Sequence, residues 1–308
     1  MFFLVGPTAV GKSEIAVEVA LRCNAEIVGA DAFQVYQGLQ ILTAKPAAEL
    51  RARVPHHLIG EIPLGEKFDV ARYRELALER IGGITRRGKR ALVVGGTGLY
   101  VRALTRGLSE LPAGNAGLRR EIERMTLAEL QARYAALDPR GMERIDQKNR
   151  RRLVRAIEVT TLAGRPFSEM RADWSGEPVA GAADGVALGQ DREELYARID
   201  ARVGRMFDLG VIEEVANAAA GETAAQAIGY AEIKGLARGE MSIEECIRAI
   251  RQRTRRYAKR QLTWLRSENI FFTINLTDKP LSEVAEKIAR RILAAAPDNG
   301  ALGGQIES

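Results

Sequence analysis

The stretch Gly6-Pro7-Thr8-Ala9-Val10-Gly11-Lys12-Ser13 fits the phosphate-loop pattern G-x-x-x-x-G-K-[ST] without a gap. The apolar run at 2–5 predicts a buried strand before it, and residues 13–20 predict a helix after it. The two glycines let the backbone curl, so that successive N–H groups and the helix N-terminus point at one anion. The flanking strand and helix argue against a chance match in an ordinary turn. All eight residues are therefore predicted to bind a polyphosphate or a diphosphate.

Two side chains of this loop have predicted roles of their own. The ammonium group of Lys12 would place a positive charge against the phosphoryl oxygens. The hydroxyl of Ser13 would be a ligand of Mg²⁺, which makes Ser13 the predicted metal-binding residue and Mg²⁺ the predicted cofactor.

Composition narrows the class of protein. The chain has 308 residues, enough for one large domain or two, and its net charge of +6 is mildly basic. The two cysteines, Cys23 and Cys246, lie too far apart to indicate a disulfide framework or a metal site. The first predicted strand begins at residue 2, which leaves no room for a signal peptide, and no apolar run approaches the ~20 residues of a membrane span. We therefore expect a cytoplasmic protein without a membrane segment.

Short apolar runs alternate with helical segments along the chain. Further strands are predicted at 26–29, 91–94, 186–189 and 270–274, and a helix is predicted at 69–87. This alternation indicates a parallel sheet with helices on both faces. The predicted fold class is α/β, with a parallel sheet core like that of P-loop NTPases.

A long stretch between the third and fourth strands has almost no clusters of β-branched residues. Helical spacing runs through 118–136 and 152–162, and the turn sequence Asp138-Pro139-Arg140-Gly141 separates the two. We predict an inserted all-helical domain at 107–183, within a core domain formed by 1–106 and 184–308.

Basic residues are concentrated in two places, with six Lys or Arg in 144–155 and six in 251–260. In the second stretch, the spacing of Ile243, Ile247, Ile250, Tyr257 and Trp264 predicts a helix with a buried stripe, from which the basic side chains project outward. Either cluster alone is equally well explained as a solvated helix face. Two clusters on a chain with a phosphate loop favour a polyanion larger than a nucleotide, bound in a salt-dependent way. Nucleic acid is the predicted second partner.

Catalytic candidates follow the second and third strands. Asp31 lies at the carboxyl edge of the predicted sheet, where ligands of such folds bind, and a carboxylate near Lys12 can accept a proton. The alternative for Asp31 is a turn or cap acid. The third strand ends in Gly-Gly-Thr instead of an acid, which weighs against repeated NTP hydrolysis. The hydroxyl of Thr97 would either cap the following helix or donate to a phosphate or leaving group.

Several ordered motifs extend over nearly the whole chain. They are GPTA at 6–9 with GKS at 11–13, DAFQVY at 31–36, TAKP at 43–46, PHHL at 55–58, GGTGLY at 95–100, RRLVRA at 151–156, QAIGY at 226–230 and KRQLTW at 259–264. Together they resemble the tRNA dimethylallyltransferases, also called tRNA isopentenyltransferases. The chain departs from that family at Ala32, where members usually carry serine, so one hydrogen bond near the carboxylate of Asp31 is in question.

The resemblance implies a reaction. Members of the family move a dimethylallyl group from dimethylallyl diphosphate to N6 of the adenosine that is 3′-adjacent to the anticodon in tRNA, and diphosphate leaves. The phosphate loop would hold the diphosphate, with Lys12 and the Mg²⁺ on Ser13 stabilising its growing charge. Asp31 would accept the proton of the amine, and Thr97 would hydrogen-bond near the leaving group or the amine. The implied catalytic residues are thus Asp31, Thr97 and Lys12.

The resemblance also implies how tRNA is held, by a protein expected to act as a monomer. The adenine must leave its stack to reach the site. The residues implied to contact the flipped nucleotide are Asp31, Ala32, Phe33, Gln34 and Thr97. Those implied to hold the backbone of the anticodon stem-loop are Arg119, Arg151, Arg152, Leu153, Val154 and Arg155.

Three other functions share some of these features. A small-molecule P-loop kinase would use the loop and Asp31, and relatives that prenylate free adenine nucleotides would use the same chemistry. Neither needs two basic clusters. A pure RNA-binding module would leave the intact loop and Asp31 without a role.

Overall fold

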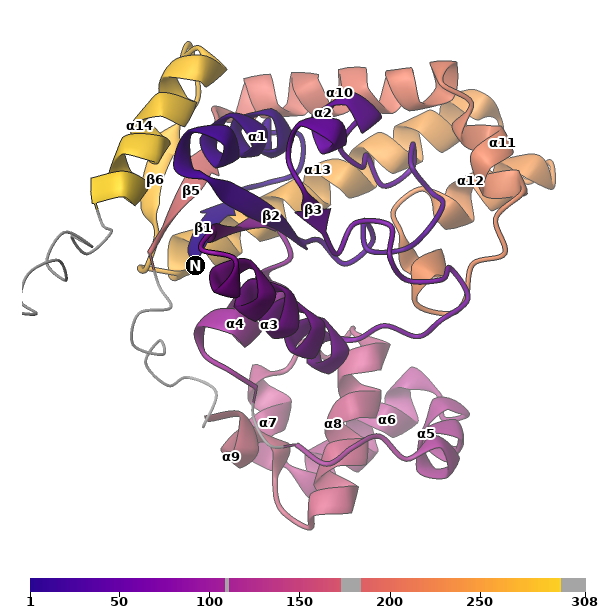
Figure 1. The fold of residues 1–308 in the computed structure, drawn as a ribbon. Coiled ribbons are helices and arrows are strands. Elements are labelled where there is room, and N and C mark those ends of the chain that lie inside the picture. Colours follow the sequence, from indigo (N-terminus) through magenta and orange to yellow (C-terminus); the bar gives the residue numbers. More distant parts are fainter. Residues whose placement is uncertain (109–110, 173–183, 295–308) are drawn as a thin grey trace, which may run out of the picture. The chain divides into compact units, whose positions relative to one another are not determined.

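The computed structural model describes residues 1–108, 111–172 and 184–294 (Figure 1). The chain divides into two compact units, a larger one formed by Met1–Thr105 with Ala180–Ser308 and a smaller one formed by Arg106–Val179. The insertion predicted at 107–183 begins next to the start of the smaller unit, and its predicted end lies outside the described residues.

A six-stranded parallel sheet forms the centre of the larger unit, in the order β3-β2-β4-β1-β5-β6. The strands are β1 (Phe2–Val5), β2 (Ala25–Ala30), β3 (His56–His57), β4 (Arg90–Gly95), β5 (Gly185–Gly189) and β6 (Phe272–Asn275). The parallel sheet confirms the predicted fold class. The sequence had indicated five strands, because the two residues of β3 are too few to show any periodicity.

Helices cover both faces of this sheet (Figure 1). The helices of the larger unit are α1 (Lys12–Cys23), α2 (Ala48–Arg53), α3 (Val70–Arg86), α4 (Gly98–Thr105), α10 (Arg192–Asp208), α11 (Val211–Ala216), the 3₁₀ helix η2 (Ala224–Gln226), α12 (Tyr230–Ala237), α13 (Ile243–Ser267) and α14 (Leu281–Ala294).

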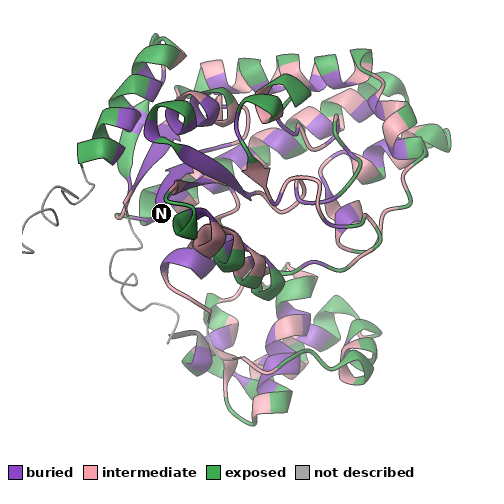
Figure 2. Cartoon of the chain, viewed as in Figure 1, coloured by how far each residue is buried: buried purple, intermediate pink, exposed green. Residues whose placement is uncertain are grey.

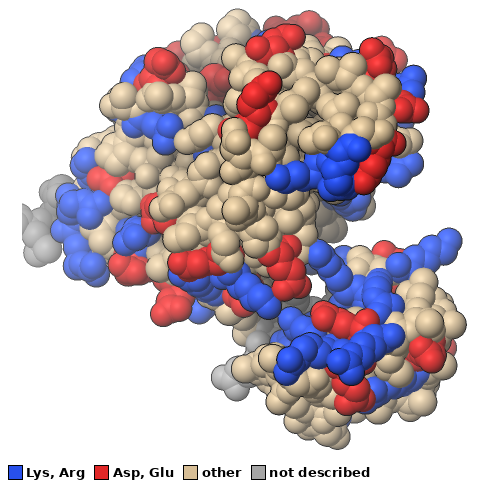
Figure 3. Space-filling view, turned by 90° about the vertical axis from the view of Figure 1, so that its right-hand side faces the viewer, with Lys and Arg blue, Asp and Glu red and all other residues tan. Residues whose placement is uncertain are grey.

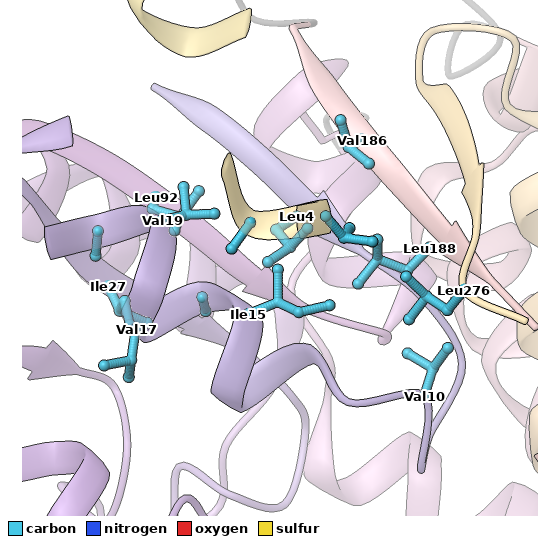
Figure 4. Packing of buried hydrophobic residues seen from close by; sticks show 14 of the residues in the cluster. Leu4, Val10, Ile15, Val17, Val19, Ile27, Leu92, Val186, Leu188 and Leu276 are labelled. Atoms are coloured by element: carbon cyan, nitrogen blue, oxygen red, sulfur yellow. The ribbon is translucent and has the colours of Figure 1, made fainter. Parts of the chain in front are cut away.

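The side chains of β1 separate two hydrophobic clusters, because successive residues of a strand point to opposite faces. Leu4 belongs to a cluster with Ile15 of α1 and residues of α10 and α14 (Figure 4). Phe3 belongs to the other cluster, with Tyr73 of α3 and Tyr100 of α4. Figure 2 shows that the central strands are buried along their length. The predicted packing of helices on both faces is therefore confirmed.

Helices are the only regular elements in the described residues of the smaller unit. Its helices are α5 (Ala116–Glu123), α6 (Leu127–Leu137), α7 (Pro139–Arg144), α8 (Arg150–Ala163) and α9 (Phe167–Ala172). They enclose a hydrophobic cluster of their own, centred on Ile122, Leu130 and Tyr134.

Two details of this unit differ from the sequence prediction. Residues 118–136 form two helices, because Thr126 and Glu129 make a capping box that begins α6. The sequence 138–141, expected to be a turn, begins α7, since the carboxylate of Asp138 accepts a hydrogen bond from the N–H of Gly141 at 2.7 Å. Both segments show that a capping side chain decides whether a polar stretch breaks a helix or begins one.

Candidate active site

The phosphate loop joins β1 to α1 and lines a cavity of about 540 Å³ in the larger unit. The loop residues on the cavity wall are Thr8, Ala9, Gly11, Lys12 and Ser13. Gly11 has φ 97°, a left-handed conformation that favours glycine, and α1 begins at the next residue. Of the other predicted loop residues, Val10 points into the hydrophobic core, while Gly6 and Pro7 contribute their carbonyl groups.

Lys12 is the cation at the centre of this loop. Its ammonium group donates hydrogen bonds to the carbonyl oxygens of Gly6, at 3.0 Å, and Pro7, at 2.8 Å. Burial lowers the pKa of Lys12 to about 8, although the charge of Asp31 acts in the opposite direction. The carbonyl contacts hold the ammonium group of Lys12 at the wall of the cavity.

Helix α10 brings three arginines to the same cavity, Arg198, Arg202 and Arg205. Arg202 donates to the hydroxyl of Thr8 at 2.8 Å, and Arg198 donates to the carbonyl of Ala9 at 2.9 Å. Burial lowers the pKa of Arg202 to about 10, and its Nε has no hydrogen-bond partner among the described residues. The sequence interpretation missed these arginines. Their signal was the spacing i, i+4, i+7 on one helix face after β5, which nearby acidic residues obscured.

Asp31 follows β2 and lines both the large cavity and an adjoining one of about 60 Å³. Its Oδ1 accepts hydrogen bonds from the backbone N–H groups of Phe33, at 2.9 Å, and Gln34, at 3.2 Å. Oδ2 has no hydrogen-bond partner among the described residues. The turn role expected as the alternative for Asp31 is therefore observed at Oδ1, while its role as a proton acceptor stays a prediction.

Thr97 supports this turn from β4. Its hydroxyl accepts a hydrogen bond from the backbone N–H of Ala32 at 3.1 Å, and its carbonyl begins the hydrogen bonding of α4. Thr97 lines neither of the two cavities. Burial, reinforced by the charge of Asp31, raises the pKa of Tyr257, which hydrogen-bonds to Thr97. The structure thus places Thr97 behind the carboxylate of Asp31.

Gln261 of α13 joins the phosphate loop to the turn after β4. Its Oε1 accepts from the N–H of Thr8 at 2.8 Å, and its Nε2 donates to the carbonyl of Gly96 at 2.9 Å. A Cβ at Gly96 would lie 2.3 Å from this amide nitrogen, so only glycine fits there. The role of Gln261 was missed, although it belongs to the KRQLTW motif that carries the resemblance.

The other residues expected to contact the flipped nucleotide lie on the same turn. Phe33 lines the small cavity, and Gln34 lines the large one. The side-chain amide of Gln34 donates to the carbonyl oxygens of Thr43 and Ala44, at 3.2 and 3.0 Å. Gln34 therefore holds a neighbouring loop, a role that its position in the motif did not indicate.

In the smaller unit, the expected RNA contacts fall into three groups. Leu153 and Val154 are 0 and 5 % exposed, so their side chains lie in the core and not on a surface that could contact RNA. Arg119 and Arg155 each donate to Glu158, at 2.6 and 2.8 Å. Burial opposes the charged form of Glu158, but these arginines outweigh it and lower its pKa.

Arg151 and Arg152 complete the run at the start of α8. Both are exposed. Figure 3 shows Lys and Arg side chains gathered on the surface of this unit. Of the predicted backbone contacts, these two arginines have the exposure that a phosphate contact requires.

The basic stretch of α13 differs from its prediction. Arg253 pairs with Glu232 and Arg255 pairs with Asp200, so acids from other helices neutralise two of its cations. Ile243, placed in the buried stripe, is 40 % exposed. The buried stripe instead includes Cys246 and Thr254. The face that this 25-residue helix buries is narrower than the positions of its large apolar residues suggested.

Two further properties bear on ligands. Within the described ranges, no three or more His, Cys, Asp or Glu side chains are grouped as a metal site would require. The helices of these ranges are also too short or too polar to cross a bilayer.

Comparison with known proteins shows the family of this chain. The family model described as IPP transferase matches residues 34–268. The tRNA dimethylallyltransferase 1 of Citrifermentans bemidjiense is 46 % identical over 86 % of this chain and 89 % of its own length. This chain belongs to the tRNA dimethylallyltransferase family. The enzyme of Geobacter metallireducens is 45 % identical, with 86 % of this chain and 88 % of that protein aligned.

Solved structures of dimethylallyltransferases share the fold. The full-length tRNA isopentenylpyrophosphate transferase of Bacillus halodurans superposes with a TM-score of 0.69 at 33 % identity, over 95 % of both chains. A eukaryotic dimethylallyltransferase captured acting on tRNA gives 0.78 at 25 % identity, over 98 % of this chain and 81 % of that one. The predicted family and its P-loop NTPase-like core are confirmed.

Proposed function

We propose that this protein transfers the dimethylallyl group of dimethylallyl diphosphate to N6 of the adenosine 3′-adjacent to the anticodon in tRNA. The bond from N6 to the allylic carbon forms as the bond from that carbon to the diphosphate oxygen breaks. The electron pair of the broken bond leaves with diphosphate, and one proton leaves N6. The site therefore needs groups that stabilise the leaving diphosphate and a group that accepts the proton.

The observation that carries the proposal is the convergence of anion-binding groups and one carboxylate on a single cavity. Lys12 and Arg202 line the 540 Å³ cavity, and so does Asp31. A site that only bound phosphate would have no need of a carboxylate there, because its charge repels the ligand. A group-transfer site needs both, one set for the leaving group and the other for the proton.

The leaving group is stabilised by cations that are already desolvated. The pKa of Lys12 is lowered to about 8 and that of Arg202 to about 10, chiefly by burial. Charge that develops on diphosphate would interact strongly with them, since little water has to reorganise. The N–H groups of the loop and the start of α1 add to this field.

Asp31 would accept the proton from N6. Its Oδ1 is held by two backbone N–H groups, which fixes the carboxylate and leaves Oδ2 for the amine. Thr97 would act through the turn, because its hydroxyl holds Ala32 and does not reach the cavity.

Mg²⁺ fits this site as an ion carried by the diphosphate. The cavity offers the hydroxyl of Ser13, which has no hydrogen-bond partner among the described residues, but no protein cage of carboxylates. Mg²⁺ commonly keeps several waters and binds through few protein groups together with substrate phosphates. Bound there, it would supply further charge neutralisation for the leaving group.

The helical unit would hold the anticodon stem-loop, with Arg151 and Arg152 on its phosphates. We also propose that the enzyme acts as a monomer. Two buried free thiols, Cys23 and Cys246, suit a reducing cytoplasm.

The test is transfer of radioactive dimethylallyl diphosphate to tRNA by wild type and by Asp31→Asn. Asparagine keeps the oxygen that caps the turn but cannot accept a proton, so we expect a loss of about 10²–10⁴-fold in turnover with tRNA binding retained. Asp69→Asn is the matched control, since Oδ1 of Asp69 caps α3 through two similar hydrogen bonds away from both cavities.

The acceptor separates the alternatives. Label on tRNA supports the proposal, whereas label on AMP alone would favour prenylation of free nucleotides. Transfer of the γ-phosphate of ATP would favour a kinase. Near-normal turnover by Asp31→Asn would show that another group takes the proton.

A further inference from the structure

The loop at 36–46 carries the TAKP motif, for which the mechanism above has no role. Thr43 and Ala44 of this loop line both the large and the small cavity, as Asp31 does. Leu39 and Ala44 have φ values of 48° and 49°, in the left-handed region. Such a conformation costs roughly 1–2 kcal/mol for each non-glycine residue, so surrounding contacts must hold the loop in place.

One of these contacts comes from within the loop. Lys45 is 8 % exposed, and its ammonium group donates to the backbone carbonyl oxygens of Tyr36 and Gly38. Burial lowers the pKa of Lys45 to about 8, against the charge of Glu214. A buried cation is costly, and an apolar side chain would fill the same space at lower cost. The two carbonyl contacts explain why a lysine is useful there.

The second contact comes from α11, far along the chain. The carboxylate of Glu214 accepts from the backbone N–H groups of Ile41 and Leu42, both at 2.8 Å. Its two oxygens thus satisfy two successive loop amides. Lys45 thus ties the end of the loop to the carbonyl groups at its start, and Glu214 holds the amide groups in its middle.

The held loop is connected to the proposed base. Gln34, whose N–H is bound by Asp31, donates its side-chain amide to the carbonyl oxygens of Thr43 and Ala44. A shift of the loop would therefore move the part of the cavity wall that Thr43 and Ala44 form and release the contact that steadies the turn. The phosphate loop on the other side of the cavity makes no hydrogen bond to this segment in the described residues.

We propose that Lys45 and Glu214 are positioning residues, which clamp the 36–46 loop so that Thr43 and Ala44 shape the space in which the transferred group meets Asp31. The inference rests on the proposed function. Lys45 lines the large cavity beside the phosphate loop, but its ammonium group donates to carbonyl oxygens of its own loop, and Glu214 lines neither cavity. The clamp therefore acts on the geometry of transfer.

The test uses the full-length variants Lys45→Met, Glu214→Gln and their combination. Three quantities are measured: the single-turnover rate of transfer to tRNA, the affinity for inorganic diphosphate, and amide hydrogen exchange in peptides covering 36–46. Lys279→Met and Glu213→Gln serve as controls, since both residues are exposed and line neither cavity.

We expect transfer by each single variant to fall about 10- to 100-fold and exchange at 36–46 to be faster, with diphosphate affinity unchanged in Glu214→Gln, which lines neither cavity. The double variant should lose little more than the worse single one, because both residues hold one loop. The controls should match wild type in all three measurements.

Faster exchange without loss of transfer would overturn the proposal, and so would loss of transfer without faster exchange. If Lys45→Met does not fold, Glu214→Gln decides, since it keeps the shape of the side chain and one strong acceptor. Absence of transfer to tRNA by wild type would refute the proposed function alone, because exchange in the variants would still report whether the clamp holds the loop.

Discussion

The arginines of the cavity and those of the helical unit have opposite surroundings. Arg202 on α10 is half-buried beside Lys12, and its contact with the loop is a neutral hydroxyl, that of Thr8. Arg119 and Arg155 of the smaller unit are partly exposed and share the fully buried carboxylate of Glu158. Among the described residues, the cavity cations Lys12 and Arg202 have no carboxylate in direct contact. Arg119 and Arg155 are neutralised by the buried carboxylate of Glu158.

This difference separates cations that are available to a ligand from cations that stabilise the fold. Burying a cation without a partner lowers stability, and the charge becomes useful only when an anion arrives. Burying a carboxylate between two arginines is tolerable because all three remain paired. In these two regions, the cations whose burial lowers stability line the cavity, and those paired with a buried acid form structural contacts.

The sharpest test of this contrast is Lys12→Met. We expect kcat/KM for dimethylallyl diphosphate to fall by about 10³-fold, since a donor aimed at the developing charge is lost. Stability at pH 7 should stay equal or rise, because burial lowers the pKa of Lys12 to about 8 and so disfavours its charged form in the folded state. Radiolabel transfer and thermal unfolding measure the two effects. Lower stability would mean that Lys12 is structural, which would remove the contrast.

The double variant Arg151→Ala/Arg152→Ala tests whether the exposed cations of the helical unit bind RNA. Each phosphate contact that is lost should weaken tRNA binding and reduce the slope of log K against log salt by about 1, so affinity should fall about 10- to 100-fold at low salt. Titrations at several salt concentrations measure the slope, with Arg290→Ala on α14 as the control. An unchanged slope would place the RNA elsewhere.

The pH dependence tests whether the charge of Lys12 is in use. Because its pKa is lowered to about 8, the charged form is lost as pH rises through that value. The value of kcat/KM reports groups of the free enzyme, so it should fall about tenfold per pH unit above this point. Arg202, with a pKa of about 10, stays charged there. In Lys12→Arg the decline should move to higher pH, and a decline left at pH 8 would assign it to another group.

The sequence predicted those parts of the site that local patterns encode. The phosphate loop follows from eight consecutive residues, and Asp31 from its place after a strand. Arg202 and Gln261 join the loop from 194 and 253 residues away, and no local pattern reveals such contacts. Their hydrogen bonds exist only once α10 and α13 have packed on the sheet.

The charge clusters were predicted less well, for a related reason. A run of basic residues looks alike whether its partners are phosphates or acids on another helix. Arg255 meets Asp200 of α10, and Arg155 meets Glu158 one turn along its own helix. The first pairing depends on tertiary contacts, whereas the spacing of the second was visible in the sequence.

The smallest expected effect comes from Arg119→Gln in the helical unit. Glu158 keeps Arg155 and the N–H of Asn115, so its charge is not left without partners. Arg119 is 41 % exposed and solvent screens its charge, so we expect a loss of only about 1 kcal/mol. This loss should appear as faster amide exchange in α5 and α8, with transfer chemistry unchanged.

The stabilisation by this pairing depends on pH. The pairing lowers the pKa of Glu158, so its contribution to the stability of the fold is present above the ordinary value of 4.5 and disappears as the acid protonates below it. The difference between variant and wild type should therefore shrink in acid. A difference in stability that persists in acid would show that Arg119 contributes through packing. A loss of transfer would show that Arg119 is a ligand-binding cation.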